Sequence, residues 1–422
     1  MRDLKELTGY DIITEEKIPE VNGTGYILSH KKTKARVLVI ANDDENKVFN
    51  IGFRTPPYDD SGIPHILEHS VLCGSRKYPV KDPFVELAKG SLNTFLNAMT
   101  YSDKTVYPVA SCNEKDFENL MDVYLDAVFY PNIYEHTEIM RQEGWHYELE
   151  TVEGELSYNG VVFNEMKGAF SSPEQQMYSK IEKLLLADTP YKNESGGDPA
   201  AIPTLSQERF LDFHRKYYHP SNSYIYLYGD LDMYKELDYI DKEYLSSFDH
   251  REIDSTIAVQ TAYEQMKDES CFYSIAENES EENQTFLTYN MVVGSSLDKK
   301  QSVAMNILEY AIMDAPGAPL KKALVDAGIG EDVFASFDDG IRQTIFSIVA
   351  RNANMSDKER FVSVIRDTLT DLSGHGEEGK AIDRTSIEAA INNFEFKHKE
   401  ANFGRFPKGL MMGLDAFNTW LY

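Results

Sequence analysis

The chain carries the same order of predicted elements twice, and this repeat constrains its fold more than any other feature. HILEH (residues 65–69) and NILEY (306–310) each follow a strand-like segment. TVYPVAS (105–111) begins forty residues after the start of the first motif, and TIFSIVA (344–350) begins 38 residues after the start of the second. An amphipathic helix is predicted after each. Amphipathic helices share apolar spacing by chance, but three elements that agree in order and spacing favour an internal duplication.

The first copy combines strands with helices. β-Branched and aromatic residues predict strands at 25–30, 35–42, 47–53, 92–111 (which could form a hairpin) and 224–232. Apolar spacing predicts helices at 116–129 and from about 161 to 186. The helix that carries HILEH is expected to have Ser61 as its cap and Pro64 in its first turn, and Gly74 is expected to end it.

We therefore predict an α+β fold of two tandem homologous α/β-sandwich domains, in each of which helices cover a sheet. The first domain, which carries HILEH, is expected at 1–250, an acidic linker or crossing segment at 251–283, and the second domain at 284–422. The second copy of the motif has lost both histidines. It is expected to keep the architecture and serve as a scaffold without metal.

Composition narrows the classes of function. Hydrophobic residues make up 42% of the 422 residues, enough for two or three domains with substantial cores. A formal net charge of −28 argues against a nucleic-acid partner, and an acidic field favours basic peptides. A solvated acidic surface is nevertheless the commoner reason for such a charge.

The sequence also bears on location. The three cysteines are scattered along the chain, which indicates a reducing compartment. The N-terminal segment has no targeting pattern, and no apolar run reaches membrane-spanning length. We expect a cytoplasmic protein without a membrane partner, and the lack of a transit peptide fits a bacterial origin.

HILEH has the residue types and spacing of a zinc site. On a helix His65 and His69 lie on one face, and Glu68, three residues after His65, lies beside them. Zinc binds neutral imidazole nitrogens, and a catalytic zinc keeps one position for water, whose proton a neighbouring carboxylate can take. The order H-x-x-E-H is that of the inverted class of zinc peptidases. The alternative is a histidine pair without metal, but the enclosed glutamate favours zinc.

Two histidines need a third protein ligand to hold zinc. Glu165 in GVVFNEMKGAF is the best candidate, because small residues beside it would let it approach a neighbouring helix. Competing carboxylates lie in a charged stretch where solvent exposure is the usual explanation, namely Glu135, Glu138, Glu143 and Glu148. Spacing alone leaves these alternatives open.

Three further residues are candidates for substrate binding. Leu72 follows His65 by seven residues and is expected to form an apolar wall of the same pocket. Asn97 and Ala98 lie on the strand after the zinc helix, where an edge strand could pair with an extended peptide. An ordinary core strand explains them equally well. The glycine turn SGGDP (195–199) lacks the lysine of a phosphate loop.

Several long segments resemble the presequence-protease branch of the pitrilysin/insulinase zinc metallopeptidases. They are GIPHILEHSVLCGSRKYPVKDPFVELAKGSLNTFLNAMTYSDKTVYPVAS (62–111), GVVFNEMKGAFSSPEQQM (160–177), SGGDPAAIP (195–203) and YYHPSNSYIYLYGD (217–230). The resemblance implies that His65, His69 and Glu165 are zinc ligands and that Glu68 is the general base. It also implies that Asn97 and Ala98 pair with substrate.

The resemblance further implies one half of a clamshell, built from two related domains around a peptide chamber. Family members continue for roughly another such half, so we expect this chain to be an N-terminal fragment that needs a C-terminal half of the same polypeptide for full activity. The expected activity is zinc-dependent endopeptidase cleavage of unfolded peptides of moderate length. The alternative is a non-catalytic scaffold or binding half with a structural zinc site.

Overall fold

The computed structural model describes residues 2–81, 83–376, 381–400 and 403–422, which form two compact units. Unit 1 consists of Met1–Ser172, Thr189–Ala258 and Phe403–Leu421, and unit 2 consists of Pro173–Asp188, Val259–Asn402 and Tyr422. These units differ from the predicted domains in two segments, and they also divide the predicted linker, with residues 251–258 in unit 1 and residues 259–283 in unit 2. Residues 173–188 belong to the second unit, and residues 403–421 return to the first.

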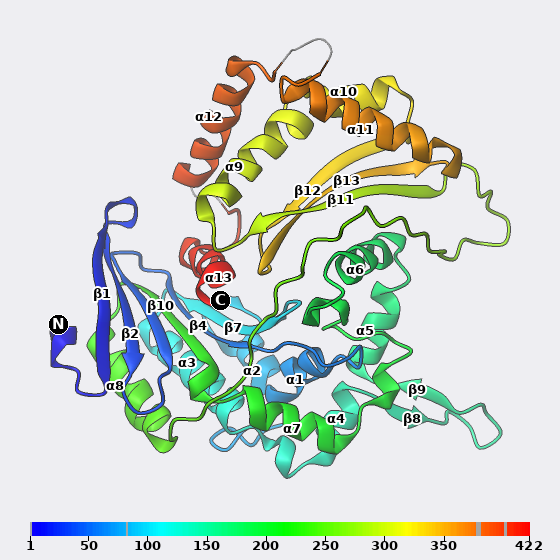
Figure 1. Cartoon of the computed structure of the whole chain (residues 1–422). Coiled ribbons are helices and arrows are strands. Elements are labelled where there is room, and N and C mark those ends of the chain that lie inside the picture. The colour runs from blue at the N-terminus through cyan, green and yellow to red at the C-terminus, as the bar shows by residue number, and fades with distance from the viewer. Residues whose placement is uncertain (1, 82, 377–380, 401–402) are drawn as a thin grey trace. The chain divides into compact units, whose positions relative to one another are not determined.

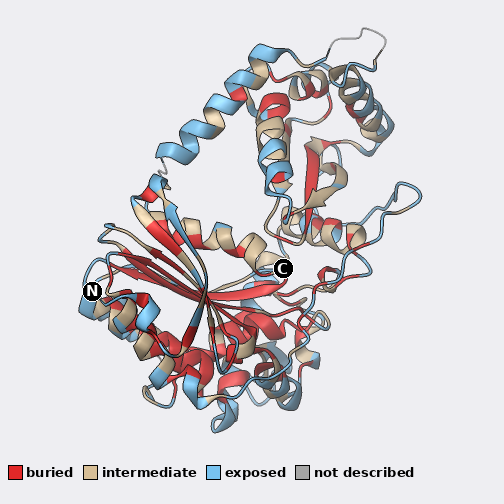
Figure 2. Cartoon of the chain, turned by 60° about the vertical axis from the view of Figure 1, so that its left-hand side comes forward, coloured by how far each residue is buried: buried red, intermediate tan, exposed pale blue. Residues whose placement is uncertain are grey.

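Unit 1 is built on an eight-stranded mixed sheet with the order β1-β2-β3-β10-β4-β7-β5, in which β6 also pairs with β7 (Figure 1). The strands are β1 (Tyr10–Ile18), β2 (Gly23–His30), β3 (Arg36–Ala41), β4 (Lys47–Arg54), β5 (Asn93–Leu96), β6 (Met99–Thr100), β7 (Lys104–Ser111) and β10 (Ser223–Gly229). β10 runs parallel to β3 and antiparallel to β4. The strand predicted at 224–232 is therefore a central strand of the sheet, and it is buried along its length (Figure 2).

Helices cover both faces of this sheet. They are α1 (Ile63–Val71), α2 (Pro83–Gly90), α3 (Glu114–Phe129), α4 (Thr137–Glu143), α5 (Val161–Ala169), α7 (Gln207–Tyr217), α8 (Met233–Glu243) and α13 (Lys408–Trp420), with a small ribbon of β8 (His146–Glu148) and β9 (Ser157–Asn159). One face, with Phe49, Ile51 and Tyr107, packs in a core with α1 and α3. The other face, with Val48 and Val106, packs against α13.

The repeat predicted from the sequence is visible in the sheet topology of unit 2. Its strands are β11 (Thr285–Ser295), β12 (Asp332–Asp338) and β13 (Gln343–Ala353), in the order β11-β13-β12. Its helices are α6 (Pro173–Leu185), α9 (Lys299–Glu309), α10 (Pro319–Asp326), α11 (Lys358–Leu372) and α12 (Arg384–Glu400). In unit 1, β4 pairs antiparallel with β7, which pairs with β5, and in unit 2 β11 pairs antiparallel with β13, which pairs with β12. The α+β prediction of helix-covered sheets is confirmed.

Three local predictions needed correction. Helix α1 ends at Val71, three residues before Gly74, which was expected to end it. Gly62, in the left-handed region at φ 70°, takes the N-cap position of α1, and no side chain caps the helix. The predicted cap, Ser61, lies one position too early. The helix expected from 161 to 186 is two helices, α5 and α6, which belong to different units. None of the described helices combines the length and the apolar character that crossing a membrane requires.

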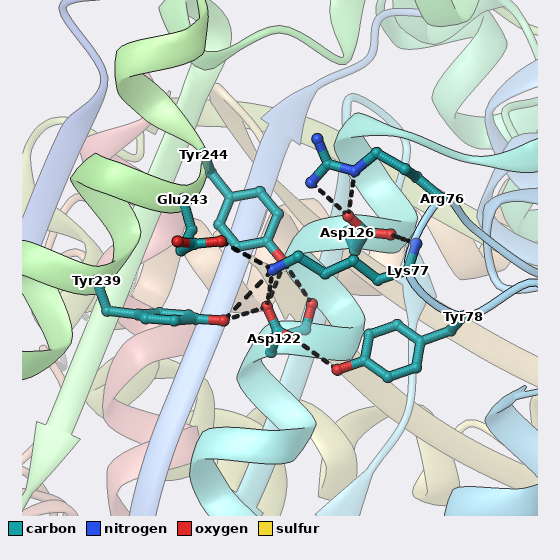
Figure 3. Close-up of polar contacts among 8 residues, drawn as sticks. All are labelled: Arg76, Lys77, Tyr78, Asp122, Asp126, Tyr239, Glu243 and Tyr244. Carbon is teal, nitrogen blue, oxygen red and sulfur yellow. Dashed lines mark hydrogen bonds and ion pairs between the residues drawn. The ribbon is translucent and has the colours of Figure 1, made fainter.

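Two aspartates on α3 hold the loop that follows α1 (Figure 3). The Asp126 carboxylate is fully buried and accepts hydrogen bonds from Arg76 Nη2 at 2.8 Å and from the Lys77 backbone N–H at 2.6 Å. One turn earlier, the Asp122 carboxylate accepts from a larger set of donors, Lys77 Nζ and the hydroxyls of Tyr78, Tyr239 and Tyr244. These contacts join the loop after α1 to α3 and α8.

Unit 1 should lose stability in mild acid because of His214 on α7. Tyr134 donates a hydrogen bond to His214 Nδ1 at 2.7 Å, and Nε2 donates to the Val128 carbonyl oxygen at 3.0 Å, so the buried ring is held neutral. Burial lowers the pKa of His214 to about 4. The unfolded chain, with a histidine pKa near 6.5, takes up the proton first as the pH falls, so stability is present above that pH and is lost below it.

We expect His214 to reduce the free energy of unfolding by about 2 kcal/mol between pH 7 and pH 5. Urea unfolding of metal-free protein at the two pH values measures this. The metal is removed because zinc release on protonation of its histidine ligands would add its own pH dependence to the free energy of unfolding. His214→Gln should remove that part of the pH dependence, whereas His136→Gln, at a half-exposed side chain, should leave it unchanged. Equal pH dependence in all three proteins would contradict the assignment.

Candidate active site

Helix α1 presents the three groups of the HILEH motif on one side. It is a buried helix, so apolar residues occupy most of its circumference, and Ile63, Ile66, Leu67 and Val71 are all in the core. Pro64 lies in the first turn, where a missing N–H is tolerated. The rings of His65 and His69, one turn apart, have centroids 5.0 Å from each other.

Glu165 reaches both imidazoles from α5. Its Oε2 lies 3.7 Å from His65 Nε2 and 3.7 Å from His69 Nε2. Among the described residues, one ligand atom from each of His65, His69 and Glu165 can be chosen so that all three lie within 4.8 Å of one another. The structure thus brings the third predicted ligand to the other two, across 95 intervening residues of sequence.

The remaining nitrogen of each imidazole has its own acceptor. His65 Nδ1 lies 3.1 Å from the Gly196 carbonyl oxygen and donates to it, since a carbonyl only accepts. His69 Nδ1 lies 3.4 Å from Glu143 Oε2, at the end of α4. Both contacts leave the Nε2 lone pairs directed toward Glu165. Such outer acceptors fix the tautomer and ring orientation of metal-binding histidines.

This donor set fits zinc. Two neutral imidazole nitrogens and one carboxylate oxygen are the protein ligands of a catalytic zinc that keeps a fourth position for water. Hard cations such as Mg²⁺ and Ca²⁺ prefer oxygen ligands throughout. The chemistry of the donors and their outer acceptors therefore favours a transition metal of the zinc type.

Glu68 lies beside the trio without belonging to it. It is mostly buried, and burial raises the pKa of its carboxyl above the ordinary value, opposed by the Thr100 hydroxyl and by the charges of His65 and His69. A raised pKa suits a group that must accept a proton and later return it. For His69, burial lowers the pKa, but the hydrogen bond and charge of Glu143 outweigh it and raise the imidazole pKa overall.

The predicted substrate-pairing residues lie at the edge of the sheet. Asn97 and Ala98 connect β5 to β6, and both of these strands pair with β7. The Asn97 N–H donates to the Pro108 carbonyl oxygen at 3.4 Å. Substrate pairing by this edge stays a prediction.

Leu72 has a different environment from the one expected. It follows the last residue of α1 and belongs to the hydrophobic core of unit 1, with 8% of its surface exposed. The structure therefore places it among core residues, and its predicted contact with substrate stays a prediction.

Sequence reasoning missed two functional contacts. Glu143 was considered as a metal ligand, but it contacts His69 Nδ1, the ring nitrogen that does not face Glu165. Gly196 belongs to the SGGDP turn, which contributes to the site through a backbone carbonyl oxygen, the acceptor of His65 Nδ1. A Cβ on Gly62 would lie 2.8 Å from the Gly196 carbonyl oxygen, so a glycine at this position lets the turn approach the start of α1. The sequence signals of this contact are Gly62, before the histidine motif, and the distant glycine pair of SGGDP.

Comparison with protein families identifies the class of this fold and site. A model of the insulinase family (peptidase family M16) matches residues 48–179, and a model described as the peptidase M16 inactive domain matches residues 204–394. The chain belongs to peptidase family M16. Within it, the chain falls in the presequence-protease branch, as the sequence motifs predicted.

Individual relatives support this placement. "Protein HypA" of Clostridium perfringens is 53% identical over 415 residues, which are 98% of this chain and 42% of that protein. Presequence protease 1 of Arabidopsis thaliana is 43% identical over 425 residues, 100% of this chain and 39% of that protein. The chain thus spans about two fifths of the length of these relatives.

A solved structure shows the same fold. A protease from Helicobacter pylori aligns with a TM-score of 0.66 at 16% sequence identity, over 94% of this chain and 89% of that one. At this identity the likeness concerns the fold alone.

Proposed function

We propose that this chain carries the metal centre of a zinc-dependent endopeptidase. The observation that carries the proposal is the convergence of His65, His69 and Glu165, with Glu68 on the same helix as the two histidines. Membership of a peptidase family supports hydrolysis of peptide bonds. The metal and the mechanism are inferred from the donor set.

Each residue has a distinct role in the proposed reaction. A bound zinc supplies Lewis-acid polarisation of the scissile carbonyl and makes water more acidic. Glu68, which is not one of the three ligands, accepts the proton of the attacking water and returns it to the leaving amine. Glu143 and the Gly196 carbonyl hold the two imidazoles in the tautomer that can bind metal.

The substrates proposed are unfolded peptides of moderate length. An edge strand at Asn97 and Ala98 would bind an extended segment through main-chain hydrogen bonds, which a folded protein does not offer. The curated relatives are more than twice as long as this chain. We therefore propose that full activity needs a further C-terminal half of the same polypeptide, beyond these 422 residues.

Zinc stoichiometry tests the proposal. Elemental analysis of protein saturated with zinc and then desalted should give about one equivalent per chain. His65→Ala should lose it, while His136→Ala, at a histidine outside the trio, should retain it. Absence of zinc from the parent chain, or its retention in His65→Ala, would overturn the metal site.

The number of protein ligands bears on the alternative function, a non-catalytic half with a structural zinc. A structural site is closed by four protein ligands, and the set found among the described residues has three. In unit 2 Asn306 and Tyr310 stand in place of the motif histidines, so we propose a scaffold role without metal for that unit. Cytoplasmic location and bacterial origin remain predictions, the second supported by the Clostridium perfringens relative.

A further inference from the structure

The ribbon of β8 and β9 projects from unit 1 immediately before the helix that carries Glu165 (Figure 1). Tyr147 and Tyr158 are directly paired across it, with ring centroids 5.3 Å apart. Trp145 contacts both rings, and Tyr158 also contacts Phe163 on α5. An aromatic cluster therefore runs from the ribbon into the ligand helix.

One face of this ribbon is apolar and open to solvent. Leu149 directly follows β8 and Leu156 directly precedes β9, each two residues from a paired tyrosine. Because side chains alternate between faces along a strand, continued alternation would place both leucines on the face of Tyr147 and Tyr158. The exposed fractions on this face are 58% for Tyr147, 50% for Leu149, 62% for Leu156 and 44% for Tyr158. Contiguous exposed apolar side chains mark an interaction site, and a two-stranded ribbon gains stability when such a face is covered.

The charge of the ribbon selects among partners. Residues 146–160 contain four glutamates, Glu148, Glu150, Glu153 and Glu155, and neither lysine nor arginine. The last three of these are exposed. Negative charge at the rim of an apolar face attracts a cationic partner and repels an acidic one.

The ribbon is close enough to the metal site to act on the same substrate. Tyr158 precedes Val161, the first residue of α5, by three residues, and Glu165 follows one helical turn later. These steps place the base of the ribbon within roughly 17 Å of the Glu165 backbone. An extended peptide spans that distance in about five residues.

We propose that the apolar face of the β8–β9 ribbon is a binding site for basic, apolar segments of the peptide substrate, several residues away from the scissile bond. The inference rests on the proposed peptidase function for its biological meaning. The binding itself requires no turnover, so it can be measured separately from catalysis.

The test uses the 422-residue chain and three fluorescently labelled peptides of equal length. One peptide alternates lysine or arginine with leucine, one has glutamate in place of the basic residues, and one keeps the basic residues but replaces leucine with serine. Fluorescence anisotropy gives the three dissociation constants. The first peptide should bind about tenfold more tightly than either of the others, at low and at physiological salt.

Variants locate the site. Leu149→Ser combined with Leu156→Ser should weaken binding of the basic apolar peptide roughly tenfold, because two apolar contacts are lost. Glu150→Gln, Glu153→Gln and Glu155→Gln together should weaken it and reduce its salt dependence. The matched control is Ile13→Ser on β1, where an apolar side chain of 64% exposure lies on another part of unit 1 and binding should not change.

Three results would overturn the inference. The ribbon variants would bind the basic apolar peptide as the parent does, the acidic peptide would bind equally well, or light scattering would show a dimer that the leucine variant converts to monomer. None of these touches the proposed zinc site, whose own test is zinc content. Conversely, if the chain bound no zinc but the ribbon still bound the basic apolar peptide, the proposed catalytic function would be wrong and the proposed peptide-binding site would stand.

Discussion

Replacement of Glu68 by glutamine is expected to leave zinc bound and to reduce peptide hydrolysis by about 10³-fold. The amide preserves the size of the side chain but cannot accept a proton at neutral pH. Because Glu68 lies outside the set of ligand atoms, its loss should not open the metal site. The measurement pairs zinc content with initial rates on a fluorogenic peptide, in the polypeptide form that shows activity.

Two control variants distinguish the role of the general base from the roles of the metal ligands and their hydrogen-bond acceptors. Glu165→Gln should lose both zinc and turnover, since it removes one of three donors. Glu143→Gln should retain the site but weaken zinc binding by about 10- to 100-fold, because it disturbs the acceptor of His69 Nδ1. Glu68→Gln with undiminished activity, or with the zinc loss expected of Glu165→Gln, would show that the roles are wrongly assigned.

The centre of this site was predictable because helix geometry is local. Spacings of three and four residues bring His65, Glu68 and His69 to one side of a helix whatever the rest of the chain does. The duplicated order of strand, helix, strand and helix was also readable, since each unit must bury one apolar face in the same way. The sheet orders β4-β7-β5 and β11-β13-β12 agree with that prediction.

The outer contacts of the site were not predictable for the opposite reason. The Gly196 carbonyl lies 131 residues after His65, and a backbone oxygen has no side-chain identity to recognise in a sequence. Glu143 could be placed near the site only once α4 was known to lie beside α1. The resemblance to a family, more than spacing, selected Glu165 among the glutamates.

The predicted domain boundaries differ from the bounds of the two units where a helix packs on a sheet that is distant in sequence. An amphipathic pattern shows that a helix buries one face, but not which sheet receives it. Helix α6 follows α5 in the chain yet contacts β11, and α13 follows unit 2 yet covers the sheet of unit 1. The apolar residues of α13 are therefore part of the core of unit 1.

This role of α13 leads to the second large effect, that of Phe417→Ala. Phe417 is fully buried against β4 and β10, where a Cβ on Gly52 would lie 2.7 Å from its ring. Truncation of a buried phenylalanine removes its transfer free energy and leaves a cavity, so we expect a loss of about 3–5 kcal/mol in the unfolding of unit 1. Urea unfolding followed by fluorescence measures it, and Trp420, whose ring lies 5.1 Å from that of Tyr224, reports the release of α13.

Glycine variants test whether this effect comes from close packing of α13. A Cβ on Gly413 would lie 2.5 Å from the Tyr226 ring, whereas a Cβ on Gly90 in α2 would meet open space. Alanine favours a helix over glycine by about 1 kcal/mol, so Gly90→Ala should be neutral or stabilising. Gly413→Ala should destabilise in spite of that gain, because the ring is held by the hydrogen bond from the Tyr226 hydroxyl to the Gly409 carbonyl oxygen at 2.9 Å. If both variants stabilised the protein equally, or if Phe417→Ala unfolded at the parent's urea concentration, α13 would have to be loosely attached and the sheet of unit 1 stable without it.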